Sequence, residues 1–305
     1  MASLHKIGND VTGIHELMKK VRRLEIRTGR DVTGIFAGNY RSSFRGSGIE
    51  YEDVREYQEG DDVRSIDWGV TAREGKPFVK LYREEREMNT FFVLDTSANM
   101  RFGTTERMKI ETALEAAAIL SFSAFRSSDR LGAFFYHNEQ PLFFPSKKGK
   151  GNMLRILQHA ISTTETRESR APNEIELLQT FSKLSKKKRG ICFFLSDRIS
   201  KEAETTVLLL HQQYDFVFIR CTDPFESNPE QTLFFPFSGT ALGKMLPSGG
   251  KKFWKRYADV YEEEEQRLQL FLRRGKIDTI TISTEENIPE KLFSFFKMRQ
   301  KKLAF

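Results

Sequence analysis

An α/β fold with a doubly wound, mostly parallel sheet is the class that this sequence predicts. From residue 90 onward, apolar stretches typical of strands alternate with stretches of helical periodicity. Phenylalanine occurs 27 times, often as adjacent pairs inside the apolar stretches, which indicates a sheet covered on both faces. Strands separated by helices of this length favour parallel pairing with right-handed crossovers.

The first half of this region contains three expected strands and a buried helix. Residues 91–95 (FFVLD) form an apolar run that ends in an acid, and residues 108–125 are apolar nearly all round. We therefore expect a central strand followed by a buried helix. Residues 131–136 read as a second strand, and the prolines within 141–145 place a third strand at a sheet edge.

The second half alternates in the same way. One helix has Leu154, Leu157 and Ile161 on one face, and Asn173 with Glu176 forms a capping box that begins the next. The remaining expected elements are strands over 191–195, 216–221 and 277–282, and helices over 201–213, 253–274 and 289–297. Gly275 is the expected end of the long helix.

The part before residue 89 has a different character, with dense charge and short apolar runs. A helix is expected over 15–26, and two strands with a short helical piece over 49–87, around a turn at 59–62. We favour a structural role, in which Arg/Asp pairs and the Trp68 indole hold this small sheet together; the alternative is a docking surface or switch that controls the α/β domain. The predicted organisation is an N-terminal helix-plus-strand region over 1–88 and an α/β domain over 89–305.

Composition limits the classes of function. The chain has 305 residues, 39% of them hydrophobic, and a net charge of +7, which permits nucleic acid, an acidic lipid or an acidic protein as the partner but requires none of them. No apolar run reaches the roughly 20 residues of a membrane-spanning helix, and the first residues lack a secretion-signal core. The two cysteines lie in apolar runs, as expected of buried thiols in a reducing compartment. A cytoplasmic location is expected.

Two predicted strands end in an aspartate, Asp95 and Asp197. With the common strand order 3-2-1-4-5-6, these strands are neighbours at the point where the order reverses, and both acids face one crevice. Ser97 and Asn99 follow Asp95 at a spacing of two and can add oxygen atoms to the same site. Such a set suits Mg²⁺ or Mn²⁺. The alternative from spacing alone is that both aspartates cap the following helices.

The segment from Asp95 to Asn99 resembles the Asp-x-Ser-x-Ser metal-ion-dependent adhesion site of von Willebrand factor A domains. The upstream stretch, with its pieces Arg-Glu-Tyr, Gly-Asp-Asp, Ile-Asp-Trp, Thr-Ala-Arg and Glu-Glu-Arg, resembles the signature of the domain-of-unknown-function-58 family. That family joins a charged N-terminal region to a von Willebrand A-like domain. The resemblance extends from about residue 15 to the end of the chain.

The chain departs from the adhesion-site pattern in two places. Asn99 replaces the second serine, although an amide oxygen can still bind a hard cation. The loop in which the pattern has a threonine contains no threonine but carries Lys147, Lys148 and Lys150. These lysines are candidate contacts for an acidic partner.

The resemblance implies a non-enzymatic protein-interaction module that acts as an adaptor or effector of a MoxR-type AAA+ ATPase. A basic nucleic-acid-binding protein is the alternative, because basic runs recur and Phe253 and Trp254 lie among basic residues. An enzyme is not expected. Asp95 lacks a second acid two residues on, and the chain has neither a paired histidine motif nor a phosphate-binding loop.

Overall fold

The structure is a computed structural model that describes residues 50–83, 88–137, 140–165, 174–185, 190–227 and 251–303. These residues belong to two compact units, one ending at Met88 and the other beginning at Asn89. The expected helix over 15–26 lies outside the described residues.

The first unit is a two-stranded antiparallel sheet with a short helix, as the sequence predicts. Its elements are β1 (Glu50–Glu56), η1 (Val63–Ser65), α3 (Trp68–Glu74) and β2 (Phe78–Arg83). Gly60 has a φ of 109° in the turn after β1, a conformation that favours glycine. The side chain of Asp67 accepts hydrogen bonds from the N–H groups of Gly69 and Val70 and so caps the start of α3.

An Arg/Asp pair does stabilise this unit, but the tryptophan does not. The Arg55 guanidinium donates two hydrogen bonds to the Asp61 carboxylate, at 2.8 and 2.7 Å. The side chain of Trp68 is 68% exposed, so the expectation that its indole packs inside the small sheet is wrong. The helix that begins at Trp68 turns this residue toward solvent.

The second unit is built on a six-stranded sheet with the order β5-β4-β3-β6-β7-β8. All neighbouring strands are parallel except β4 and β5, which form an antiparallel pair at one edge. Counted along this sheet, the order is 3-2-1-4-5-6, as the sequence analysis assumed. The strands are β3 (Asn89–Leu94), β4 (Arg130–His137), β5 (Gln140–Lys147), β6 (Gly190–Ser196), β7 (Asp215–Thr222) and β8 (Asp278–Ser283).

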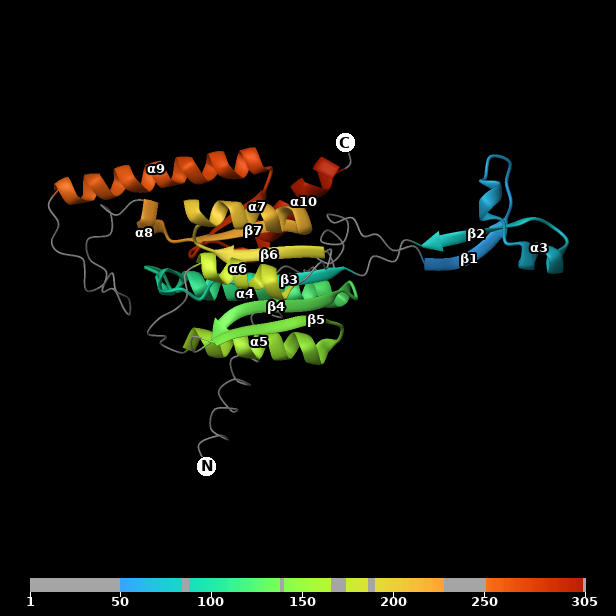
Figure 1. Cartoon of the computed structure of the whole chain (residues 1–305), viewed down its shortest axis with the longest axis horizontal. Coiled ribbons are helices and arrows are strands. Elements are labelled where there is room, and N and C mark those ends of the chain that lie inside the picture. The colour runs from blue at the N-terminus through green and yellow to red at the C-terminus, as the bar shows by residue number, and fades with distance from the viewer. Residues whose placement is uncertain are drawn as a thin grey trace, which may run out of the picture. The chain divides into compact units, whose positions relative to one another are not determined.

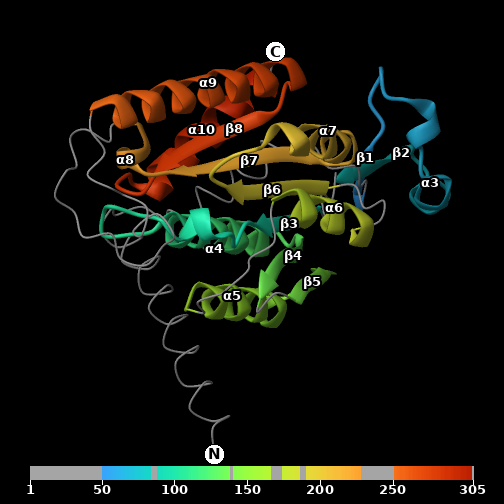
Figure 2. The same cartoon turned by 60° about the vertical axis from the view of Figure 1, so that its left-hand side comes forward.

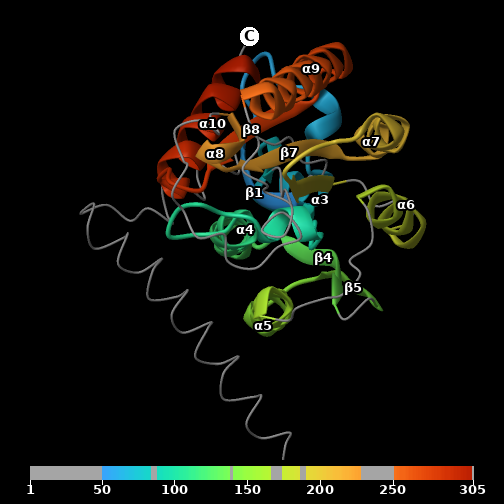
Figure 3. The ribbon, with the colours of Figure 1, turned by 90° about the vertical axis from the view of Figure 1, so that its left-hand side faces the viewer.

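Helices cover both faces of this sheet (Figures 1 and 3). One face carries α6 (Glu174–Leu184), α7 (Glu204–Gln213) and α9 (Lys251–Gly275), and the other carries α4 (Lys109–Arg126), α5 (Lys150–Glu165) and α10 (Ile288–Leu303). Figure 2 shows the same layers from a second direction. Two 3₁₀ turns, η2 (Ala98–Arg101) and η3 (Lys201–Ala203), and the short α8 (Pro224–Ser227) complete the described elements. The doubly wound α/β class is therefore confirmed.

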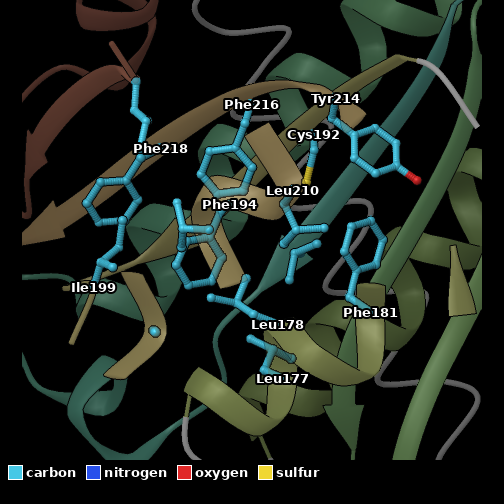
Figure 4. Packing of buried hydrophobic residues seen from close by; sticks show 14 of the residues in the cluster. Leu177, Leu178, Phe181, Cys192, Phe194, Ile199, Leu210, Tyr214, Phe216 and Phe218 are labelled. Atoms are coloured by element: carbon cyan, nitrogen blue, oxygen red, sulfur yellow. The ribbon is translucent and has the colours of Figure 1, made fainter. Parts of the chain in front are cut away.

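The paired phenylalanines divide between the two faces because neighbouring side chains in a strand point to opposite sides. On one face, Phe194 lies beside Phe216 and Phe218, and α6 and α7 cover them (Figure 4). On the other face, Phe193 stacks on Phe92 and meets Phe296 of α10. No helix among the described residues combines the length and apolar character that crossing a membrane requires.

Close strand packing makes Gly190 a sensitive position. A Cβ atom at Gly190 would lie 2.0 Å from the carbonyl oxygen of Asn89, its neighbour across the β3–β6 pair. We expect Gly190→Ala to lower the free energy of unfolding by about 3 kcal/mol, because backbone atoms must separate. Urea denaturation followed by circular dichroism measures this change.

Gly151→Ala is the matched control. A Cβ at Gly151 meets no atom within 4 Å, and the residue lies in α5, where alanine is favoured over glycine. This variant should be at least as stable as the wild type. Equal stability of the two variants would contradict the close β3–β6 packing.

Candidate functional site at the carboxyl edge of the sheet

Three neighbouring strands end in an acid at the same edge of the sheet. Asp95 follows β3, Asp197 follows β6 and Asp223 follows β7. The order of the strands reverses between β3 and β6, where ligands of open α/β sheets bind. The structure therefore brings Asp95 and Asp197 to one place, as the sequence predicted.

Asp95 is almost completely buried, at 3% exposure. Its Oδ1 accepts a hydrogen bond from the N–H of Ser97 at 2.8 Å, and its Oδ2 accepts one from Oγ of Ser196 at 2.6 Å. Burial raises the pKa of Asp95, the negative charge of Asp197 raises it further, and the serine hydrogen bonds oppose both effects. The groups around Asp95 therefore stabilise the negative charge of its carboxylate only in part.

Lys109 binds the carboxylate of one strand-end acid, Asp197, directly. This lysine is the first residue of α4 and is 1% exposed. Its ammonium donates to Oδ2 of Asp197 at 2.8 Å and to Oε1 of Glu226, in α8, at 2.5 Å. Burial lowers the pKa of Lys109, but attraction by the two carboxylates outweighs it and raises the pKa overall. The lysine is therefore held as an ammonium between the end of β6 and α8.

The other oxygen of Asp197, Oδ1, is buried and has no hydrogen-bond partner among the described residues. A buried carboxylate oxygen in that state is costly unless something binds it. It is the structural observation that points most directly to a cation or a hydrogen-bond donor as the ligand of this crevice.

Asn99, the amide of the predicted ligand set, is already engaged by an arginine. With its amide oxygen turned toward Arg198, Asn99 accepts hydrogen bonds from Nη2 at 2.7 Å and Nη1 at 3.3 Å. Nε of Arg198 lies 3.5 Å from Oε2 of Glu174, at the start of α6. Glu174 also accepts a hydrogen bond from the N–H of Ser200. Burial raises the pKa of Glu174 to about 7.

Asp223 has a different role from the other two strand-end acids. Its carboxylate accepts hydrogen bonds from the N–H and hydroxyl of Thr104, from the hydroxyl of Thr284 and from the N–H of Phe225. These donors come from the loops that hold Thr104 and Thr284 and from the start of α8. Asp223 therefore fixes these loops in place, and its oxygens are already bound.

A hard cation fits part of this arrangement. Asp95, Ser97 and Asp197 offer oxygen atoms of the kind that Mg²⁺ prefers. Within the described ranges, no group of three or more His, Cys, Asp or Glu side chains is arranged to hold a metal ion. A cation here would therefore rest on two carboxylates, a hydroxyl and water, with Asn99 engaged by Arg198.

The structure does not bring Lys147, Lys148 and Lys150 to this site. Because β5 runs antiparallel to β4, Lys147 lies opposite Leu131, near the start of β4. Asn152 donates to the carbonyl oxygens of both residues and holds the loop there. The start of a parallel strand is at the opposite edge from its carboxyl end, so the idea that these lysines border the Asp95 site is wrong.

Sequence reasoning missed Lys109, Arg198, Glu174 and Glu226. One signal was available, because a lysine in the first turn of an apolar helix opposes the helix dipole and needs a compensating acid. The run FVFIRCTD, ending in Asp223, also repeats the strand-plus-aspartate pattern of the two predicted sites. Nothing in the sequence indicates that Arg198 meets Asn99, since that contact depends on the path of two loops.

Comparison with known proteins identifies the family. Residues 53–233 match the model of DUF58, described as a protein of unknown function. The chain belongs to the DUF58 family. This match covers both the signature of the first unit and the strands that carry Asp95 and Asp197.

Similar curated proteins are themselves uncharacterised. Proteins of Mycobacterium bovis and of two strains of Mycobacterium tuberculosis are each 30% identical to this chain over 182 residues. The matched segment is 60% of this chain and 57% of the length of each relative.

Solved structures with a similar arrangement include three proteins, each 11% identical to this chain. A conserved hypothetical protein, BatB, from Bacteroides thetaiotaomicron has a TM-score of 0.42, covering 70% of this chain and 99% of its own. An aerotolerance-related membrane protein from Bacteroides fragilis has a TM-score of 0.46 with the same coverage. The VWA domain of SpRpn10 has a TM-score of 0.34, covering 68% and 93%.

Removing the Lys109 ammonium should destabilise the second unit. Lys109→Met leaves Asp197 and Glu226 buried without their shared cation, and we expect a loss of about 3 kcal/mol in the free energy of unfolding. Urea denaturation at neutral pH measures it. Lys201→Met, at an exposed position in η3, is the control and should change stability little. A Lys109→Met protein as stable as this control would contradict the assigned ion pairs.

Glu174 should make stability depend on pH. Its pKa is about 7 in the folded chain against an ordinary 4.5, so between these values the folded state keeps a proton that the unfolded state has lost. Wild-type stability should therefore fall as pH rises through this range, by about 1.4 kcal/mol per pH unit at most. Glu174→Gln keeps a neutral acceptor and should show a smaller fall than the wild type.

Unfolding curves of wild type and Glu174→Gln between pH 5 and pH 8 test this expectation. The variant should be the more stable protein at the upper end of the range. Glu176→Gln, at an exposed position of the same helix, should follow the wild-type curve. Parallel curves for wild type and Glu174→Gln would show that this carboxyl is not perturbed.

Proposed function

We propose that this DUF58 chain is a non-enzymatic protein-interaction module, and that its binding site is the carboxyl edge of the sheet around Asp95 and Asp197. The observation that carries the proposal is that these two acids meet although they come from segments far apart in the sequence. Asp95 and its hydrogen-bond partner Ser196, which directly precedes Asp197, are separated by 101 residues. One oxygen of Asp197 is buried there without a partner among the described residues. Binding of a cation or of a hydrogen-bond donor would satisfy this oxygen.

The charge of the site supports a divalent cation. Asp95, Asp197 and Glu226 bring three carboxylates, against the single ammonium of Lys109. Two negative charges remain when all three acids are ionised, and Mg²⁺ or Mn²⁺ cancels that amount. Asp95, Ser97 and Asp197 would hold the ion. When bound, it supplies an open coordination position for a carboxylate of the partner.

The partner follows from the family resemblance. We propose a MoxR-type AAA+ ATPase, or another protein that offers an acidic residue, and a cytoplasmic location for the complex. The chain's role would be that of an adaptor or effector, in which binding rather than catalysis is the activity.

Asp95→Asn tests the cation and the site together. The substitution keeps the shape of the side chain and removes its charge, so we expect saturable binding of Mn²⁺ by the wild type and at least about a tenfold weaker affinity in the variant. Isothermal titration calorimetry measures both. Asp259→Asn, at an exposed position on α9, removes one carboxylate elsewhere and should bind Mn²⁺ like the wild type.

Binding of a purified MoxR-type ATPase, measured with and without Mn²⁺, extends the test to the partner. Binding that requires the cation and is lost in folded Asp95→Asn supports the proposal. Equal binding by wild type and folded Asp95→Asn would exclude this edge as the interaction site.

A further inference from the structure

A groove lies at the edge of the six-stranded sheet that is formed by its last strand, β8. It has a volume of about 770 Å³ and is lined by residues of α9, β8 and α10, with Arg220 of β7. Figure 3 shows β8 between these two helices. The groove lies beside Asp278, Thr279 and Thr281 of β8, and its lining residue Arg220 also donates a hydrogen bond to the backbone carbonyl of Asp197.

The backbone of β8 is open toward this groove. Within the described part of the chain, β8 pairs with β7 alone. The N–H of Thr284 donates to the carbonyl oxygen of Thr222, and hydrogen-bonding groups alternate in direction along a strand. Thr279 and Thr281 therefore direct their N–H and C=O groups away from β7, and both residues line the groove.

The open stretch has a defined end. The N–H of Ser283, next in the same alternation, donates to the Glu286 side chain at 2.9 Å. Edge strands with free backbone groups are sites where an extended segment can add as a further strand.

Basic side chains outnumber acidic ones around the groove. The acids are Glu265 and Asp278, and the bases are Arg220, Arg273, Lys276, Arg299 and Lys302. Both acids are already engaged, Glu265 with Arg220 at 2.5 Å and Asp278 with Arg299 at 3.3 Å. Arg273 and Lys276 are exposed at the end of α9 and the turn after it, so the groove presents an excess of positive charge to a ligand.

The groove also has an apolar lining. Leu268 and Phe295 form part of its buried wall, and Met298 of α10 is 60% exposed at its rim. A segment that alternates acidic and apolar residues would place its acids near the bases and its apolar side chains against this wall. A second copy of this chain is a poor occupant, because it would bring the same positive charges face to face.

We propose that this groove binds an extended acidic peptide segment of a partner protein, which adds to the sheet as a strand beside β8. Backbone hydrogen bonds to Thr279 and Thr281 give the affinity, and Arg273 and Lys276 select acidic segments. The proposed peptide contacts include neither the cation nor Asp95.

The test uses a fluorescent nine-residue peptide of alternating glutamate and valine, titrated into the full chain and followed by anisotropy. The double variant Arg273→Glu/Lys276→Glu should weaken binding at least about tenfold, because attraction becomes repulsion. Lys147→Glu/Lys150→Glu carries the same change of charge at the end of β5 and the start of α5 and should bind the peptide like the wild type. Equal losses in both double variants would overturn the proposal, since net charge alone would then explain binding.

Two N-methylated peptides test strand addition without altering the protein. In an added strand, alternate N–H groups face β8, so methylation of one alternate set should abolish binding and methylation of the other should leave it nearly unchanged. Equal tolerance of both methylated peptides would show that no strand forms. A thymidine oligonucleotide that competes as strongly as the peptide would likewise overturn the proposal, because it would show a general anion surface.

Discussion

The ion pairs of the Lys109 ammonium determine how the carboxyl edge of the sheet is organised. This one group joins the start of α4, the end of β6 and the short helix after β7, through Asp197 and Glu226. Its burial is tolerated only because two carboxylates compensate it. The positions of the loops around Asp95 depend on this arrangement, since Glu226 also accepts a hydrogen bond from the N–H of Asp223, and the Asp223 carboxylate binds Thr104.

The same ammonium leaves the edge incompletely neutralised. Lys109 binds one oxygen of Asp197, and the other oxygen has no partner among the described residues. The pKa values of Asp95, Glu226 and Glu174 are all raised, in each case first by burial. Several buried acids with raised pKa values in one crevice lower the stability of the folded chain. Such groups are typical of binding sites, where a ligand compensates the buried charge.

Much of the fold could be predicted from sequence because its signals are local. Apolar runs and helical periodicity lie within single segments. The strand order was assumed to be the common one for such an alternation, and with that order Asp95 and Asp197 were expected to meet. The lysine loop was misplaced because its position depends on the direction of β5, which runs antiparallel, and the residues of the run do not specify that direction. Trp68 was misjudged for a related reason, since exposure depends on which face of α3 the unit covers.

The location of the lysines changes what the candidate site can bind. With Lys147, Lys148 and Lys150 at the other edge, the described cations that contact this site are Lys109, Arg198 and Arg220, and a carboxylate engages each of them. Without a divalent cation the crevice is therefore negative and would attract a basic group. With the cation it becomes neutral and offers a coordination position to an acid. The sign of the partner's charge at this edge thus depends on whether the cation binds, and an acidic partner is compatible only with the occupied site.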